Sequence, residues 1–340
     1  MADVQKQLLK FHNSIKLSEN SQNAKLREKR EIIINALKDG LKRISEESGS
    51  ELLKFEHFNQ GSYAMGTGIN PKDGDYDIDV GIVFQNQKWD FATPVQLKKT
   101  IRDAVSTDGR NVRIRRPCVT VEYLKNEEVD YHVDLAIYAQ TPGDDLELAV
   151  GREHSSAENQ NWEYSDPKGL ISAFKDKYDG DDAAQLRRTV RYLKKWRDKN
   201  FASGAPTSIA LTCAAYHWFA PTKSFGEYTD TKAFKNVVDA MYLEAQGRRL
   251  SVPLPVTPYT DLLAGMTESQ MDNMRVQLEI AQSSLQQAID TESVVEACEK
   301  LKKLLGDEFE VPDDGGDGGS GSRTAKRSAV PPYVTTGTSA

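Results

Sequence analysis

Two aspartates, Asp77 and Asp79, lie two positions apart in the segment DIDVGIVF. A side-chain period of two places both carboxylates on one face of a strand and Ile78 and Val80 on the other. A third aspartate, Asp134, lies in the similarly patterned segment HVDLAIY. If the two strands are neighbours, three carboxylates converge, and ionised carboxylates so close together require a cation. The pattern indicates a site for Mg²⁺ or Mn²⁺, two of which can stabilise the attacking and leaving oxygens of nucleotidyl transfer.

A glycine-rich segment, GSYAMGTG, precedes the paired aspartates and begins at Gly61 and Ser62. Small residues let the backbone approach a ligand closely, while successive amide N–H groups and two hydroxyls can bind phosphate oxygens. Neither feature is specific alone, because an Asp-x-Asp pair at a strand edge is usually solvated polar decoration. The loop, the pair and the third aspartate together predict a nucleotide-binding catalytic site.

The segments that must position these residues alternate between helical and strand-like patterns. Helical spacing of apolar residues over 22–47 predicts one long amphipathic helix, and a second helix is predicted near 94–105. Alternating runs predict strands at 55–58, 76–84, 112–115, 119–124 and 131–138. This order predicts an α+β catalytic domain over residues 1–165, with a mixed sheet backed by the long N-terminal helix.

The remainder of the chain divides into a helical lobe and a tail. Polar, turn-rich sequence at 141–167 interrupts the strand pattern, and helical periods then dominate from about residue 170 to 305. We expect residues 166–310 to form a mostly helical substrate-binding lobe, which makes the molecule bilobal. Residues 311–340 are rich in Gly, Ser, Pro and Thr and cannot bury a core, which predicts a disordered tail.

Composition limits the classes of partner. The chain has 340 residues and a formal net charge of -7, which argues against coating nucleic acid by bulk electrostatics and leaves only focused polyanion sites. No cleavable leader and no apolar run of membrane-spanning length is visible, so we expect a cytoplasmic protein without membrane contact. Cys118, Cys213 and Cys298 are isolated within apolar patterns and are predicted to be buried thiols.

Basic residues gather in two places. Residues 182–200 predict an amphipathic helix rich in Arg and Lys, part of whose face can meet a triphosphate, although a solvated basic face explains any one residue equally well. The arginines in 110–116 suit a phosphate channel or an RNA surface, but a solvated hairpin is at least as good an interpretation. His217 lies on an apolar helix and is predicted to be a core residue. His132 shares the face of Asp134, either supporting that carboxylate or serving as an ordinary strand histidine.

The motifs GSYAMGT, DIDV and HVDLAIY together resemble those of polymerase-β-like nucleotidyltransferases, and their spacing is similar to that of the bacterial cGAS/DncV-like nucleotidyltransferases, the CD-NTases. The segment WEYSDPKGL resembles the entry to the helical lobe in these proteins. Their oligoadenylate-synthase-like relatives have a Lys before a Trp and then Pro-x-Ser-x-x-Leu, matched here by Lys194, Trp196, Pro206, Ser208 and Leu211. The resemblance covers most of residues 20–310. It implies that Lys194 contacts the donor triphosphate and that Ser208 hydrogen-bonds it.

The resemblance further implies a cyclic oligonucleotide synthase that joins NTPs, with ATP and GTP as the first candidates, and releases pyrophosphate. Asp77 and Asp79 would bind two divalent ions, and Asp134 would bind one of them and orient or deprotonate a ribose hydroxyl. The product would be a cyclic di- or trinucleotide that activates an effector in bacterial antiphage (CBASS) defence. The alternative is an RNA-tailing or small-molecule nucleotidyltransferase with the same triad. An inactive nucleotide sensor has no reason to keep three mutually repelling acids.

The tail carries a second hypothesis. In CD-NTase operons that encode ubiquitin-transfer-like enzymes, the flexible C-terminus of the synthase ends in a small residue and is joined covalently to targets. Residues 319–340 resemble such a tail, which implies conjugation through Ala340 by a ubiquitin-transfer-like enzyme. An ordinary disordered end explains the same composition equally well.

Overall fold

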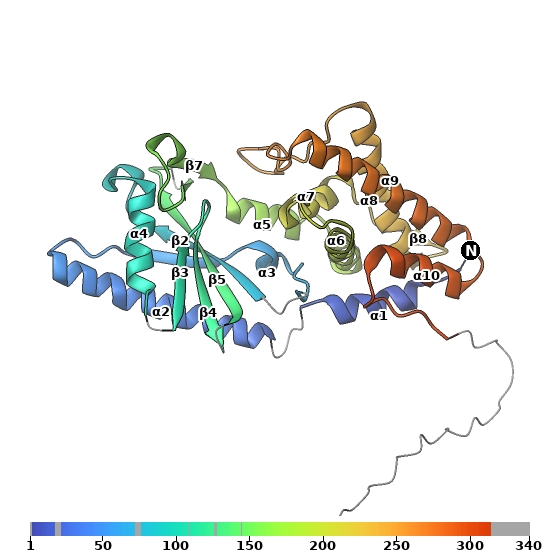
Figure 1. The fold of residues 1–340 in the computed structure, drawn as a ribbon, viewed down its shortest axis with the longest axis horizontal. Coiled ribbons are helices and arrows are strands. Elements are labelled where there is room, and N and C mark those ends of the chain that lie inside the picture. The colour runs from blue at the N-terminus through green and yellow to red at the C-terminus, as the bar shows by residue number, and fades with distance from the viewer. Residues whose placement is uncertain are drawn as a thin grey trace, which may run out of the picture.

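The computed structural model describes residues 2–17, 22–71, 76–107, 109–125, 128–143 and 145–313, which form two lobes (Figure 1). One lobe contains a mixed sheet with helices packed on it, and the other is built mostly of helices. The α+β, bilobal fold predicted from the sequence is confirmed. No helix within the described ranges is long and apolar enough to cross a membrane.

The elements follow one another in a sheet-forming half and a helical half. The helices are α1 (Gln5–Ile15), α2 (Gln22–Ser48), α3 (Gly61–Met65), α4 (Pro94–Val105), α5 (Pro167–Lys175), α6 (Gly180–Asn200), α7 (Ser208–Trp218), α8 (Asp230–Gly247), α9 (Glu268–Asp290) and α10 (Val294–Leu305). The strands are β1 (Phe55–Asn59), β2 (Tyr76–Phe84), β3 (Arg110–Ile114), β4 (Val119–Lys125), β5 (Glu128–Gln140), β6 (Leu146–Val150), β7 (Asn161–Ser165), β8 (Lys223–Ser224) and β9 (Glu227–Tyr228). Short 3₁₀ turns occupy Lys88–Asp90 and Ala157–Asn159.

The main sheet runs in the order β1-β2-β5-β4-β3, and β6 joins it by pairing with β5 and with β7. Strands β2 and β5 are parallel, and the other neighbouring pairs are antiparallel. One face of the sheet packs against α2 and α4 through a core that includes Ile78, Leu135, Leu37 and Ile101, each almost fully buried. Period-two alternation leaves the polar residues of β2 and β5 on the opposite face.

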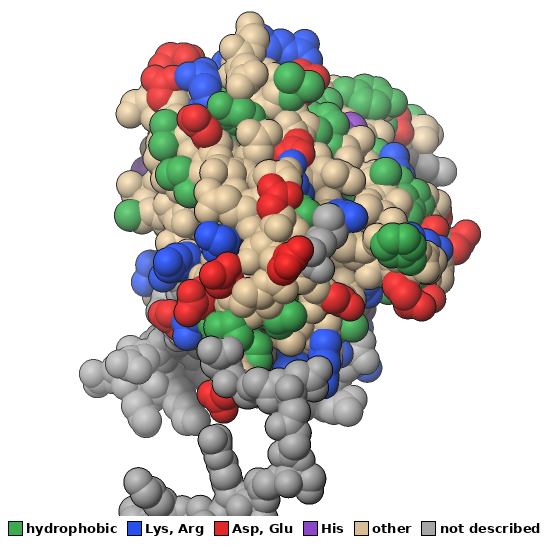
Figure 2. Space-filling model, turned by 90° about the vertical axis from the view of Figure 1, so that its right-hand side faces the viewer, with side chains coloured by type: hydrophobic (Ala, Val, Ile, Leu, Met, Phe, Trp, Pro, Cys, Tyr) green, Lys and Arg blue, Asp and Glu red, His purple; other side chains and the backbone are tan. Residues whose placement is uncertain are grey.

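The helical lobe begins where the sheet ends. Asp166 caps α5, since its Oδ1 accepts a hydrogen bond from the Gly169 N–H at 2.7 Å, and Pro167 occupies the first turn. Helices α5 to α10 then enclose one core, with Trp196 and Phe234 fully buried inside it. Figure 2 looks onto the outer end of this lobe, where acidic and basic side chains are interspersed with apolar and neutral ones.

Helix α1 belongs to the helical lobe, although it is the first element of the chain. Leu8, Phe11 and Ile15 recur on one face of α1 and are buried in the core formed by α6 to α10. The predicted catalytic domain, residues 1–165, therefore requires a correction at its N-terminal end, because α1 packs on the other lobe. The short, polar sequence around α1 hid this pattern.

The last described residues are also fixed to the helical lobe. Phe309 is fully buried, and its ring centroid lies 5.2 Å from that of Phe11. Lys195, almost fully buried on α6, places its Nζ 2.6 Å from Glu308 Oε1. The predicted tail, 311–340, lies outside the described residues from position 314 onward, and Ala340 with it.

Strands β6 and β7 lie inside the segment 141–167, which the sequence pattern had marked only as polar and turn-rich. Both are short, and β7 carries the sequence NWEYS, in which no apolar alternation extends far enough to be distinctive. The pairing of β6 with β5 and of β7 with β6 makes them strands, so tertiary context rather than local pattern decides this region.

Candidate active site

The three aspartates lie on two neighbouring parallel strands. In the register of β2 and β5, Asp77 is paired with His132 and Asp79 with Asp134. Paired residues project from the same face of a sheet, so the three carboxylates share one side, whereas Ile78 is fully buried on the other. The structure therefore brings together the residues that the spacing of the two motifs had singled out.

The electrostatics of this group are unfavourable without a counterion. Burial, and after it the negative charges of Asp77 and Asp134, raises the pKa of Asp79 from 3.8 to about 7. The pKa of Asp77 is raised as well, although its side chain opens into a cavity, because protein surrounds it on the remaining sides and Asp134 adds its charge. A positive ion beside these groups would restore the ionised form of both.

The donor chemistry fits a divalent cation that binds together with a nucleotide. Within the described residues, no group of three or more His, Cys, Asp or Glu side chains is arranged to hold a metal ion by itself. Mg²⁺ rarely uses such all-protein cages, since it commonly takes one or two carboxylates and completes its shell with substrate phosphates and water. Asp77, Asp79 and Asp134 supply carboxylates of this kind.

Asp134 is held in place by its neighbours across the sheet. The Thr120 hydroxyl on β4 donates a hydrogen bond of 2.6 Å to Asp134 Oδ1, and His132 Nε2 lies 3.8 Å from Asp134 Oδ2. Thr120 is almost fully buried, so its bond is shielded from water. One carboxylate oxygen is thereby fixed, and His132 supports the other from the same strand.

The glycine-rich segment forms the short helix α3 against the aspartates. Gly61 has a φ of 62°, and a Cβ at this position would lie 1.8 Å from Asp79 Oδ2. Only glycine satisfies both the positive φ and the close approach. The Gln60 N–H donates to the Asp79 carbonyl at 3.0 Å, which fixes the start of the loop on β2.

A cavity of about 250 Å³ lies between the lobes and gathers the predicted site residues except Asp134, which lies beside Asp79 on β5 but does not line the cavity. Its lining includes Gly61, Ser62, Asp77 and Asp79 from the sheet lobe and Lys194 and Ser208 from the helical lobe. Residues from two lobes that are far apart in sequence therefore surround one volume, as expected for a site that closes around its substrate.

Lys194 does not project freely into this cavity. Its Nζ donates a hydrogen bond of 3.0 Å to the Thr67 carbonyl and is almost fully buried. Burial, followed by the positive charges of Arg197 and Arg191, lowers the pKa of Lys194 to about 8, against the opposite effect of the aspartates. In this arrangement Lys194 fastens the loop that follows α3 to the helical lobe.

Arg197 is a site residue that the sequence motifs did not single out. It lines the same cavity, and its Nη1 donates a hydrogen bond of 2.7 Å to Ser208 Oγ while its Nη2 lies 2.6 Å from Asp198 Oδ1. Arg197 is one turn beyond Lys194 on α6, so helical spacing from the motif lysine was the available signal.

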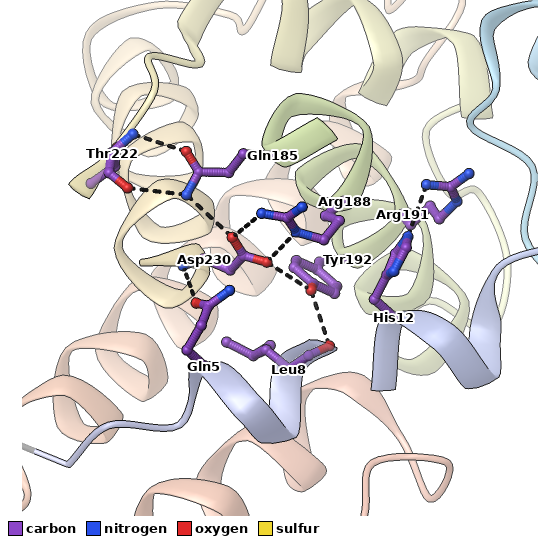
Figure 3. A network of polar contacts seen from close by, with 9 residues as sticks. All are labelled: Gln5, Leu8, His12, Gln185, Arg188, Arg191, Tyr192, Thr222 and Asp230. Atoms are coloured by element: carbon purple, nitrogen blue, oxygen red, sulfur yellow. Dashed lines mark hydrogen bonds and ion pairs between the residues drawn. The ribbon is translucent and has the colours of Figure 1, made fainter. Parts of the chain in front are cut away.

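The loop after α3 is also fastened by Arg191. Its Nη2 donates to the Gly66 carbonyl at 2.6 Å and its Nε to the Gly68 carbonyl at 3.0 Å, while its Nη1 lies 3.0 Å from His12 Nε2 on α1. Figure 3 shows the contact between Arg191 and His12 beside a buried network around Asp230 on α8. Asp230 accepts hydrogen bonds from Arg188, at 2.6 and 2.9 Å, and from the Tyr192 hydroxyl at 3.1 Å. These contacts join helices α1, α6 and α8 to one another and connect α6 to the loop after α3.

A second cavity, of about 690 Å³, lies on the other side of α3 and is strongly basic. His12, Lys16, Arg27, Arg187 and Arg191 contribute to its lining. Burial and the nearby charges, chiefly those of Arg191 and Arg188, lower the pKa of His12 to about 4. The basic face predicted for 182–200 is therefore divided between this cavity and the aspartate cavity.

The remaining sequence predictions concern the core. Cys118, Cys213 and Cys298 are all buried free thiols, as predicted. His217 is only partly buried, and its Nε2 lies 2.7 Å from the Pro253 carbonyl, so it is a hydrogen-bonded structural histidine of the helical lobe. Neither residue type adds a further nucleophile or ligand to the cavity.

Comparison with known proteins identifies both lobes. The family described as cyclic GMP-AMP synthase DncV-like, nucleotidyltransferase domain, matches residues 55–138, and the cyclic GMP-AMP synthase C-terminal domain matches residues 183–313. The fold is similar to that of Vibrio cholerae DncV cyclic AMP-GMP synthase, with a TM-score of 0.71 at 17% identity over 91% of this chain and 97% of that one.

Two further solved structures carry nucleotide ligands. The V. cholerae DncV complex with the linear intermediate 5′ pppA(3′,5′)pG has a TM-score of 0.69 at 18% identity, over 88% of this chain and 93% of that one. Escherichia coli DncV in its 3′-deoxy GTP bound form has a TM-score of 0.67 at 19% identity, over 87% and 93% of the two chains.

Proposed function

This chain belongs to the DncV-like nucleotidyltransferases, and on that premise we propose that it is a cyclic oligonucleotide synthase. The proposed reaction joins NTPs into a cyclic di- or trinucleotide and releases one pyrophosphate for each bond formed. The observation that carries this proposal is the register that sets Asp79 beside Asp134, at a cavity shared by Gly61 and Ser208 from opposite lobes. The similar structures that hold nucleotides support the same assignment.

The polar residues at the cavity, together with the adjacent Asp134, have distinct tasks in this reaction. Asp77, Asp79 and Asp134 would hold Mg²⁺ or Mn²⁺, which supplies charge neutralisation at the triphosphate and at the attacking and leaving oxygens. The Ser62 hydroxyl and the N–H groups of its loop bind the donor triphosphate from one lobe, and Ser208 with Arg197 binds it from the other.

Bond formation follows from this placement. Asp134, steadied by Thr120, orients the ribose hydroxyl of the acceptor and takes its proton. The hydroxyl oxygen attacks the donor α-phosphorus, the bond from that phosphorus to the α,β-bridging oxygen breaks, and pyrophosphate leaves. Ring closure repeats this step within the linear product: its free ribose hydroxyl attacks the α-phosphorus of its remaining 5′-triphosphate and pyrophosphate leaves, after one such transfer for a dinucleotide or two for a trinucleotide.

The assignment is tested by incubating the purified chain with Mg²⁺ and all four NTPs and analysing nuclease- and phosphatase-resistant products by mass spectrometry. We expect a cyclic product from the wild type and none from D77N/D79N. Asp39 is an exposed acid on α2, remote from the cavity lining, and D39N serves as the matched control. A product that is tailed RNA or a nucleotidylated small molecule would contradict the proposal in favour of the other polymerase-β-like activities.

We also propose that the product is a second messenger in bacterial antiphage defence, acting through a cyclic-nucleotide-activated effector. Phage plating on a host that carries the chain with its neighbouring genes tests this role. Protection should disappear in D77N/D79N and persist in D39N.

The C-terminal tail supports a separate proposal, that Ala340 is joined to targets by a ubiquitin-transfer-like enzyme. The anchoring of Phe309 and Glu308 on the helical lobe places the start of the tail on a fixed base. Intact-mass analysis of the chain from its native host tests the idea, and only unmodified Ala340 would contradict it.

A further inference from the structure

The catalytic face of the sheet continues beyond Asp134 to strand β3. In the register of the sheet, Asp134 is paired with Thr120, and Thr120 with Arg113. These side chains therefore share the face that carries the aspartates. Neighbouring strands lie about 4.8 Å apart, so two spacings, about 10 Å, separate the backbones of Arg113 and Asp134.

A buried carboxylate organises Arg113 on β3 and Arg115, the residue just after this strand. Glu122 is 5% exposed, and it accepts a hydrogen bond of 2.7 Å from Asn111 Nδ2. Its oxygens lie 3.3 Å from Arg113 Nη2 and 3.5 Å from Arg115 Nη2. The two guanidinium side chains are 56% and 55% exposed, while the Glu122 side chain is 7% exposed. Glu122 is thus an anchor below two outward-facing cations.

This cluster retains positive charge and free donors. One carboxylate balances one of the two guanidinium charges, and each guanidinium offers five N–H donors, of which these long contacts use few. The neighbouring arginines are engaged elsewhere, since Arg116 Nη2 lies 2.6 Å from Glu163 Oε1 and Arg110 lies over the Tyr123 ring. Arg113 and Arg115 are therefore the pair prepared to bind an anion on the catalytic face.

The proposed reaction requires two places for phosphate chains. In the proposed reaction the donor triphosphate binds in the cavity lined by Ser62, Arg197 and Ser208, on the α6 side of the aspartates. The acceptor presents its hydroxyl at Asp134 and keeps its own 5′-triphosphate through the first transfer. That second chain needs cationic side chains on the opposite side of Asp134, which is where β3 lies in the sheet order.

We propose that Arg113 and Arg115, positioned by Glu122, bind the 5′-triphosphate of the acceptor nucleotide. This inference rests on the proposed function. The donor triphosphate would then be bound between the two lobes, and the acceptor triphosphate by arginines at the β3 edge of the sheet.

The test separates donor from acceptor chemically. As donor we use 2′,3′-dideoxy-ATP, which has no hydroxyl with which to accept, or the dideoxy form of whichever NTP the wild type uses. As acceptors we use the nucleoside, its monophosphate and its α,β-methylene di- and triphosphates, which cannot be cleaved as donors. The single linear dinucleotide formed is quantified by chromatography with mass detection.

For the wild type, the acceptor KM should fall as 5′-phosphates are added. In R113A/R115A the KM of the methylene triphosphate should rise roughly 10- to 100-fold for each guanidinium lost, the range expected for hydrogen bonds to charged groups. The KM of the bare nucleoside and that of the dideoxy donor should stay unchanged. R110A removes the same charge from the same strand on the opposite sheet face and should behave as wild type.

An R113A/R115A enzyme that keeps the wild-type dependence on 5′-phosphates would overturn the inference. If thermal melting shows that this variant is unfolded, the single variants R113K and R115K replace it. Each should weaken binding of the methylene triphosphate while leaving the nucleoside unaffected, and unchanged phosphate dependence in both would again overturn the inference. If the wild type forms no dinucleotide from any NTP, the proposed function itself is contradicted. That outcome differs from unchanged phosphate dependence in the arginine variants, which contradicts only the inference about Arg113 and Arg115.

Discussion

Replacing Arg191 with alanine should loosen the nucleotide loop without touching any residue of the aspartate group. Arg191 holds the carbonyls of Gly66 and Gly68, at 2.6 and 3.0 Å. Hydrogen bonds to charged groups contribute about 1.5–3 kcal/mol each. The Lys194 bond to Thr67 remains in the variant and limits the loss, so we expect a net cost near one such bond, about 2 kcal/mol.

A cost of this size, about 2 kcal/mol, corresponds to roughly a 30-fold fall in kcat/KM. The loss should appear mainly in the KM for NTP, because the loop binds the triphosphate in the ground state as well as during transfer. Initial rates of pyrophosphate release against NTP concentration measure it. R191K, which keeps the charge but cannot reach both carbonyls with a planar fork, should lie between wild type and R191A.

Arg187 provides the matched control for this prediction. It lies one turn before Arg191 and lines the same basic cavity, and within the described residues no hydrogen bond or ion pair joins it to the loop. R187A should therefore keep the wild-type KM. An R191A enzyme whose KM matches that of R187A would show that the clamp on Gly66 and Gly68 does not position the loop for binding.

Three further outcomes follow from buried contacts. Thr120→Val removes the bond to Asp134 at constant shape and should lower kcat about tenfold with little change in KM. Thr100→Val, at a half-buried position of α4, should leave kcat unchanged. Equal kcat values for the two variants would refute the orienting role of Thr120. The pKa of His12 is lowered to about 4 in the folded protein. Its imidazole therefore stays neutral in the folded state, whereas in the unfolded chain it takes up a proton below pH 6.5. The stability that neutral His12 contributes above pH 6.5 is lost as the pH falls toward 4. The melting temperature should therefore fall less with acidification in H12Q than in wild type. Parallel curves of melting temperature against pH for the two proteins would contradict this prediction. Lys98 is buried, and its Nζ donates hydrogen bonds to three backbone carbonyls at 2.6, 2.9 and 2.8 Å. K98M should therefore lower the free energy of unfolding, measured by urea titration, by about 3 kcal/mol. A variant as stable as wild type would exclude a stabilising role for these bonds.

The parts of the site that lie on single strands were predictable from the sequence. Asp77, Asp79 and Asp134 each follow a period-two pattern, and that pattern alone fixes the face of the sheet from which they project. The parallel pairing of β2 with β5 was assumed rather than derived, because register depends on packing between segments more than fifty residues apart. The glycine-rich segment was predicted to let the backbone approach a ligand, whereas at Gly61 the structure shows a close approach to the Asp79 carboxylate.

Contacts between distant segments could not be read in this way. The site role of Arg197 depends on which face of α6 meets the cavity, and Lys195 and Lys199, two positions away on either side, are equally basic. The anchoring of Arg113 and Arg115 by Glu122 required the β3–β4 register, without which a solvated hairpin was an equal interpretation. The location of α1 on the helical lobe likewise follows from tertiary packing, since an amphipathic face does not state which core it joins.

The placement of α1 has a mechanical consequence. Among the described elements, the chain changes lobe between α1 and α2 and again between β7 and α5. A body attached at one point can swing in any direction, whereas a body attached at two points turns about the line that joins them. The first attachment is bonded to the loop after α3, where the Asn70 N–H donates to the Ile15 carbonyl at 2.7 Å and the Leu17 N–H to the Gly68 carbonyl at 3.2 Å. These two connections restrict any rotation of one lobe against the other to the line that joins them, and the first connection lies beside the loop after α3.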